Sequence, residues 1–217
     1  MRQIQVRQLC GRLQSAADVP EAFEKTGINY HKIDIVNWAS QYPYCPNVEF
    51  AVAHQGDAIL LHYRVEENDT RAVVGNDLGP VWEDSCCEFF ISVDEGADYY
   101  NLETNCIGTV LLCNGEGRDN RTKAPAAILN QIDRWASLGR KPFGQREGRQ
   151  AWELALAVPV SAFFRHHLQT LSGRTMRANF YKCGDKTPHP HFLSWNRISI
   201  PAPNFHRPDF FGELTFL

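Results

Sequence analysis

The sequence predicts an all-β fold, a two-sheet antiparallel β-sandwich of the jelly-roll type with little helix. Alternating apolar and polar residues recur in about ten short segments separated by turn residues, at the spacing typical of sandwiches and barrels. The sequence lacks the alternation of strands and helices that would predict a parallel sheet. The 217 residues contain no repeat, linker or low-complexity segment, so we expect one domain over residues 1–217. A closed β-barrel is the alternative.

The N-terminal quarter of the chain predicts short elements. Residues 4–9 alternate weakly and favour a strand at a sheet edge, and residues 30–36 also favour a strand. Between them, residues 19–26 favour a helix, because Asp18 suits the N-cap and Pro20 suits the first helical turn. This is one of only two segments with a helical pattern.

The clearest hairpin follows. Residues 48–54 and 59–65 alternate well, and the QGD segment at 55–57 between them is typical of a tight turn. Residues 71–74 form a short segment that could pair at an edge. Together these segments predict an antiparallel pair in the first half of the sandwich.

Further antiparallel strands are predicted in the middle of the chain. Alternation favours strands over residues 86–93, 99–106 and 109–113, joined by short turns. Residues 132–138 and 151–158 favour another antiparallel pair. This density of short strands is the main reason for expecting a sandwich.

The C-terminal part combines strands with the second helical candidate. Residues 140–149 are interpreted as a long connection, and residues 159–168 favour a short helix. Residues 176–183 alternate as a strand. The tail, residues 210–217, ends in a strand that can close the sandwich.

Four polar side chains are expected to lie together on one face of two central strands. Alternation places them opposite the core-facing side chains, and they are Glu88, Asn101, Glu103 and Asn105. Trp82 stands just before the first of these strands. An aromatic ring beside carboxylates and amides suits a sugar, because sugar CH groups pack on the indole while the hydroxyls bond to the polar side chains.

Composition and charge exclude some classes of partner. Hydrophobic residues make up 43% and charged residues 22% of the chain, which is typical of a soluble globular protein. The net charge of −3 gives no basis for binding nucleic acid or an anionic membrane. The locally basic segment 118–123 is interpreted as a solvated loop. The opening MRQIQVRQLCGRL is too polar for a signal peptide, so we expect a cytoplasmic protein.

No metal site is expected from the sequence. The seven cysteines are odd in number and lack metal-ligand spacing, so we interpret them as reduced structural thiols. His189 and His191 flank a proline whose extended geometry makes the imidazoles diverge, which favours a surface loop. A structural calcium ion stays open at residues 94–98, where Asp94, Glu95 and Asp98 are acidic but lack the regular spacing of a calcium loop.

Two tryptophans and two acids are the sharpest site candidates. Trp82 and Trp195 each lie at a strand-loop junction with polar neighbours, although a tryptophan is as often buried in a core. Glu88 and Glu103 could serve a glycosidase as a carboxyl pair, or they could bond to sugar hydroxyls. The sequence does not fix their separation, so both interpretations stay open.

Several motifs resemble carbohydrate-binding modules of family 9, in the branch of free-standing family 9-like proteins. They are VWEDSCCEFFI, YYNLETNCIGT, RANFYK, and HFLSWNRI followed by PAPNFHRPDFFGELTF. The resemblance implies a β-sandwich that grips a sugar, often the reducing end of a glycan, between two tryptophans. Its implied ligand-binding residues are Trp82, Glu88, Glu103, Asn105, Asn179 and Trp195. Glu103 departs from the family pattern, in which a basic residue occupies the second binding strand.

Three functions follow as hypotheses. The first is non-catalytic binding of a mono- or oligosaccharide without a cofactor, in support of carbohydrate catabolism. The second is an O-glycosyl hydrolase that uses Glu88 and Glu103. The third is a haem-binding sandwich, for which Met176 is the sole internal methionine available as an axial ligand.

Overall fold

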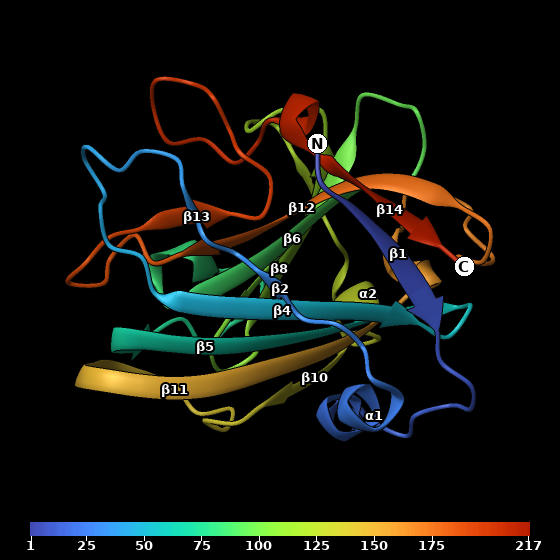
Figure 1. Cartoon of the computed structure of the whole chain (residues 1–217), viewed down its shortest axis with the longest axis horizontal. Helices are drawn as coiled ribbons and strands as arrows, with labels where there is room; N and C mark the ends of the chain where they lie inside the picture. Colours follow the sequence, from blue (N-terminus) through green and yellow to red (C-terminus); the bar gives the residue numbers. More distant parts are fainter.

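The computed structural model describes residues 1–217 and confirms the all-β sandwich (Figure 1). The strands are β1 (Gln3–Gln8), β2 (His31–Lys32), β3 (Ile35–Val36), β4 (Asn47–His54), β5 (Ala58–Ala72), β6 (Cys86–Ser92), β7 (Tyr99–Asn105), β8 (Val110–Gly115), β9 (Thr122–Lys123), β10 (Asp133–Ala136), β11 (Phe143–Pro159), β12 (Thr175–Cys183), β13 (Phe192–Ser194) and β14 (Gly212–Phe216). The two α-helices are α1 (Val19–Thr26) and α2 (Ala126–Leu129).

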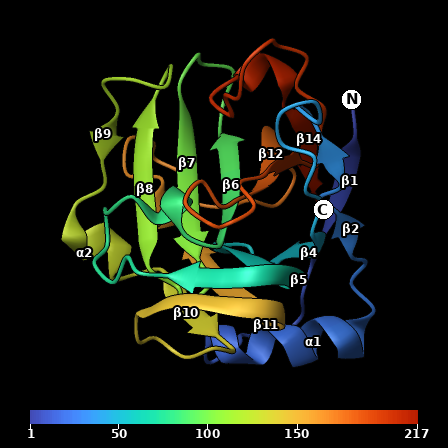
Figure 2. The same ribbon diagram turned by 90° about the vertical axis from the view of Figure 1, so that its left-hand side faces the viewer.

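The strands follow one continuous path that curls into two layers. Its order is β10-β11-β5-β4-β1-β14-β12-β6-β7-β8-β9. Figure 2 shows β6, β7 and β8 running steeply across β5 and β11, so the two layers cross instead of lying aligned. All neighbouring pairs on this path are antiparallel except the two that involve β1.

Strand β1 joins the two layers. Residues 3–6 pair in parallel with β14, and Arg7 and Gln8 pair in parallel with β4. The prediction of an edge strand at residues 4–9 is therefore wrong. Weak alternation is typical of a strand at a sheet edge, but this segment lies between two strands and buries Ile4 and Val6 in the main core.

The central strands place their side chains as alternation predicts. Cys87, Phe89 and Ile91 point into the main core. The opposite face of the same sheet is not solvated, because Phe90 and other side chains there form a second apolar cluster under the loops that carry Phe205. The polar residues on this face are consequently buried as well.

Helix α1 forms as predicted and covers the outer face of the β4-β5-β11 layer. Phe23 is fully buried there against a cluster that includes Leu60 and Ala155. Asp18 does not cap α1 itself. Its carboxylate instead accepts a hydrogen bond from the Ser15 backbone N–H and completes a capping box on the preceding 3₁₀ turn.

The prediction of a second helix at residues 159–168 is wrong. Only Val160–Ala162 forms a 3₁₀ turn, and Phe163 leaves the helical region to pack into the main core. The predicted connection at residues 140–149 lies largely within β11, because that strand pairs along most of the length of β5. Pairing with a long partner thus overrode the local turn signals in this segment.

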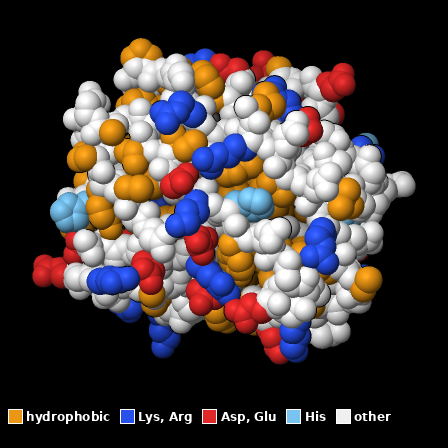
Figure 3. All heavy atoms as spheres, viewed as in Figure 1, with side chains coloured by type: hydrophobic (Ala, Val, Ile, Leu, Met, Phe, Trp, Pro, Cys, Tyr) orange, Lys and Arg blue, Asp and Glu red, His pale blue; other side chains and the backbone are white.

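The surface carries interspersed charges. On the face drawn in Figure 3, basic and acidic side chains alternate without forming a large region of one sign. None of the helices is both long and apolar enough to cross a membrane.

Candidate functional site

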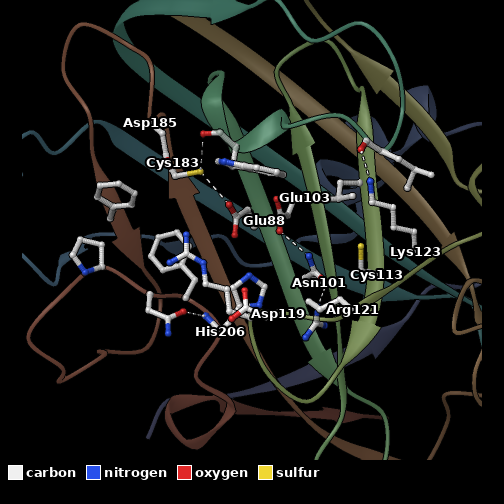
Figure 4. Close-up of a pocket in the computed structure, with 18 residues that line it drawn as sticks. Glu88, Asn101, Glu103, Cys113, Asp119, Arg121, Lys123, Cys183, Asp185 and His206 are labelled. Atoms are coloured by element: carbon white, nitrogen blue, oxygen red, sulfur yellow. Dashed lines mark hydrogen bonds between the residues drawn. The ribbon is translucent and has the colours of Figure 1, made fainter.

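A pocket of about 360 Å³ opens on the second face of the β6-β7-β8 sheet (Figure 4). Strands β6, β7, β8 and β12 form its floor, and the segments before β6, before β9 and before β14 form its walls. Its lining residues are Leu78, Trp82, Glu88, Asn101, Glu103, Leu111, Cys113, Arg118, Asp119, Arg121, Lys123, Cys183, Asp185, Phe192, Pro203, Asn204, Phe205 and His206.

Two carboxyl groups form the polar centre of the floor. Glu88 on β6 and Glu103 on β7 are paired directly across the two strands, and they are 3% and 4% exposed. Oε1 of Glu88 accepts a hydrogen bond from Cys183 Sγ at 3.0 Å. Oε1 of Glu103 accepts one from Asn101 Nδ2 at 2.7 Å, whereas Oε2 of Glu103 is buried without a partner.

Burial makes these carboxyl groups weaker acids than exposed ones. Burial, together with the nearby Glu103, raises the pKa of Glu88 well above its usual value. Burial also raises the pKa of Glu103 to about 7, although the Asn101 hydrogen bond opposes the shift. At the pocket wall, partial desolvation by surrounding protein atoms and the nearby Glu83 raise the pKa of Asp185 to about 6, although the residue as a whole is exposed. The floor therefore holds protons near neutral pH and can both donate and accept hydrogen bonds.

Arg121 orients the side-chain amide of Asn101, which donates to Glu103 in the pocket floor. Its Nε donates to Asn101 Oδ1 at 2.8 Å, and its two terminal nitrogens donate to the carbonyl oxygens of Gly115 and Tyr99 at 2.9 and 2.6 Å. The guanidinium also lies 4.2 Å from the centre of the Tyr99 ring. This fixed fork turns the Asn101 NH₂ toward Glu103.

Trp82 supplies an aromatic surface at the pocket rim. It lies on the 3₁₀ turn Val81–Glu83, and the residue is 37% exposed. The Trp82 carbonyl accepts the Asp185 N–H at 3.1 Å, and Glu83 forms an ion pair with Lys186 at 2.9 Å. These contacts attach the turn to the segment after β12 and hold the indole beside the floor.

Three of the six site residues expected from the sequence line the pocket. They are Trp82, Glu88 and Glu103. The prediction that Trp195 lines the site is wrong, because this residue is 1% exposed and lies in the main core. Its ring centre is 5.9 Å from that of Phe50 and 5.7 Å from that of Phe180. A pair of tryptophans facing each other across the pocket is therefore absent.

The two expected asparagines also lie outside the pocket. Asn105 donates to Asp84 at 3.0 Å and accepts from the Thr109 N–H at 2.9 Å. Asn179 exchanges two hydrogen bonds with the backbone of Asn196, at 2.8 and 3.1 Å. Both amides are fully used in holding loops to the sheet.

Several pocket residues were not expected to form the site. Arg121 belongs to the segment 118–123, for which a solvated loop is predicted, and its partial burial shows that this prediction is wrong at Arg121. Phe205 and His206 come from the long segment between β13 and β14. Local patterns do not reveal such residues, because loops that are distant in sequence bring them together.

The two metal candidates considered in the sequence take other roles. His189 is exposed and contacts Asp69 at 3.4 Å, as a surface loop predicts. His191 is instead 1% exposed and lies 2.8 Å from Lys182, so the prediction of a surface loop is wrong for His191. In the 94–98 segment, Asp94 and Asp98 lie close to His166. Calcium at this segment stays a prediction.

The sandwich and its pocket define a β-sheet binding module. Residues 17–216 match the model of carbohydrate-binding family 9, and the chain belongs to that family. This confirms the resemblance seen in the sequence motifs. No curated protein matches the chain.

Solved structures of other proteins share this fold. A candidate carbohydrate-binding protein from Bacteroides uniformis is 45% identical with a TM-score of 0.97, covering 100% of this chain and 99% of its own. Two family 9 modules from Caldicellulosiruptor kristjanssonii are more distant. The glucose complex is 11% identical with a TM-score of 0.56, covering 100% of this chain and 96% of its own. The cellotriose complex is 12% identical with a TM-score of 0.58, covering 99% and 93%.

Proposed function

We propose that this protein binds a saccharide without cleaving it. One sugar unit occupies the pocket, with Trp82 against its CH face and Glu88 and Glu103 bonding its hydroxyls. The unpaired Oε2 of Glu103 carries the proposal, because it is a buried acceptor on a pocket-lining residue that lacks a protein donor. A ligand hydroxyl would satisfy it and remove the cost of leaving it unbonded.

The ligand is a mono- or short oligosaccharide. A volume of about 360 Å³ lies toward the small end of pockets that bind small molecules. The distant family 9 structures contain glucose and cellotriose, which makes these sugars the first ligands to test. The reducing end, implied by the family resemblance, is the proposed terminal unit.

The geometry favours binding over hydrolysis. Glu88 and Glu103 come from directly paired positions, so both carboxyl groups lie side by side in the floor of the pocket. Glycosidases place the sugar between their two carboxyl groups, with one on each side of the scissile bond. We expect no release of aryl alcohol from aryl glycosides, and turnover abolished by Glu88→Gln would support the enzyme instead.

Calorimetric titration tests the proposed site. The wild type is titrated with glucose, cellobiose and cellotriose beside Trp82→Ala and a control, Trp135→Ala, whose half-buried indole lies on β10 away from the pocket. Loss of the stacking face should weaken binding about tenfold or more. The control should bind like the wild type. Unchanged affinity in Trp82→Ala, or no binding of any saccharide, would contradict the proposal.

A further inference from the structure

Two cysteines far apart in sequence meet beneath the pocket. Cys86 on β6 and Cys183 on β12 are directly paired across the two strands, and both are buried, at 0% and 1% exposure. Both belong to the apolar cluster on the pocket side of the sheet. Because the two residues are far apart along the chain, no ligand spacing in the sequence reveals this pair.

Glu88 completes a group of three ligands. It lies two residues beyond Cys86 and therefore on the same face of β6. The two sulfurs and a carboxylate oxygen of Glu88 all lie within 4.8 Å of one another, and Cys183 Sγ is 3.0 Å from Glu88 Oε1. With Zn–S distances of about 2.3 Å, two sulfurs of a tetrahedral zinc site lie about 3.8 Å apart. Small side-chain rotations would bring these atoms to such a site.

No lysine, arginine or histidine forms an ion pair with Glu88, and Lys182 acts on it only at longer range. The neighbouring Lys182 is turned to the other face of β12, where its ammonium contacts Glu67 at 2.7 Å and His191 at 2.8 Å. Cys183, a thiol, is the side chain that donates to Glu88. A bound divalent cation would supply the missing positive charge and convert both thiols to thiolates.

We propose that Cys86, Cys183 and Glu88 bind a thiophilic divalent cation such as Zn²⁺, with a fourth coordination position open to the pocket. Cys183 and Glu88 line the pocket, which offers the ion an entry path (Figure 4). Binding forms two metal–sulfur bonds and one metal–oxygen bond. It releases both thiol protons, and any proton on Glu88, to solvent without a redox change. Three protein ligands with an open position are typical of zinc sites that bind a further molecule.

Cobalt titration of the reduced protein tests this site. The parent protein for this titration and its variants carries Cys10→Ser and Cys45→Ser, because these two exposed thiols could bind metal outside the proposed site. We expect one equivalent of Co²⁺ to give thiolate-to-cobalt charge-transfer absorption with the d–d bands of a tetrahedral ion. At least two protons should be released per metal.

Single variants on this parent identify the ligands. Cys183→Ser and Cys86→Ser should each weaken metal binding by more than about tenfold, because even losing a residue that merely orients a ligand costs about 10–100-fold. Cys113→Ser is the matched control, since Cys113 lines the pocket outside the group of three. It should keep the full absorption. Near-ultraviolet circular dichroism reports whether each variant is folded, and the alanine variant of the same cysteine replaces any serine variant that is not.

Two results would overturn the site. One is the absence of charge-transfer absorption in the parent, which leaves the cysteines as core thiols. The other is retention of the full absorption in a folded Cys183 variant. Saccharide binding measured after chelator treatment is independent of this result, so failure of the metal site and failure of the proposed function are distinguishable.

Discussion

Glu88 and Glu103 occupy directly paired positions on β6 and β7, and both side chains are buried in the floor of the pocket. Like charges at paired positions repel, and burial adds a desolvation cost. Burial first and the nearby Glu103 second raise the pKa of Glu88, whereas the raised pKa of Glu103 follows chiefly from burial. The saccharide that we propose as ligand would bond to both carboxyl groups and so offset the cost of placing this pair in the sheet.

Replacing Glu103 with glutamine should impair saccharide binding. The unpaired Oε2 would become an NH₂ group, which cannot accept the ligand's hydroxyl proton. At a pH above the Glu103 pKa of about 7, where this carboxylate is ionised, losing a hydrogen bond to it costs about 1.5–3 kcal/mol, or about 10–100-fold in affinity. Titration calorimetry of Glu103→Gln measures the loss. Glu95→Gln, an exposed acid outside the pocket, is the control, and equal affinities for the two variants would argue against a role for Glu103.

Trp195 should contribute to stability and not to binding. Its indole lies in the main core, so Trp195→Ala should lower the free energy of unfolding by about 3–5 kcal/mol. Trp195→Phe retains part of the packing and should bind saccharide like the wild type. Denaturant unfolding and calorimetry measure the two effects. A tenfold weaker saccharide affinity in folded Trp195→Phe would show that Trp195 contributes to binding.

Lys182 and Glu67 form a buried ion pair between the two layers. Their charged atoms are 2.7 Å apart, with side-chain exposures of 0% and 1%, and Glu67 also accepts from Trp152 Nε1 at 2.8 Å. Lys182→Met should lower the free energy of unfolding by about 3–5 kcal/mol, because Glu67 is left buried without its cation. Adding Glu67→Gln should recover part of this loss.

An exposed ion pair provides the matched comparison. Lys186 contacts Glu83 at 2.9 Å, and its side chain is 59% exposed. Lys186→Met should therefore cost less than about 1 kcal/mol in denaturant unfolding. Equal losses for Lys182→Met and Lys186→Met would show that burial does not govern the strength of these pairs.

His62 should make the fold sensitive to acid. Its ring lies between the Tyr30 hydroxyl at 2.6 Å and Glu153 at 2.9 Å, near Arg64 of its own strand and Glu24 of α1. Burial, with Arg64 acting in the same direction, lowers the pKa of His62 from 6.5 to about 4. Below pH 6.5 the unfolded chain therefore takes up a proton that the folded protein does not accept until about pH 4.

The sign of the effect follows from this difference in proton uptake. Stability contributed by neutral His62 should fall as the pH decreases from 6.5 to about 4 and change little above 6.5. Unfolding free energies of the wild type and His62→Gln across this range measure it. The difference between the two proteins should shrink with falling pH, and parallel curves would assign the acid sensitivity to other histidines.

Much of the pocket floor could be predicted from local pattern. Alternation placed Glu88 and Glu103 on one face of neighbouring strands, because successive side chains in a strand point to opposite sides. The same rule separated Phe89 from the pocket face. It could not show that loops cover this face, so the floor looked solvated when in fact it is buried.

The sequence by itself determined the β-sandwich, the hairpin around residues 55–57 and the shared face of Glu88 and Glu103, because each depends on residues close together along the chain. The tertiary structure decided the rest. It placed Trp195 in the core, Arg121 in the pocket wall, and Cys86 opposite Cys183. Those positions depend on how distant strands pair when the sheet curls, and alternation within one strand carries no information about its neighbours.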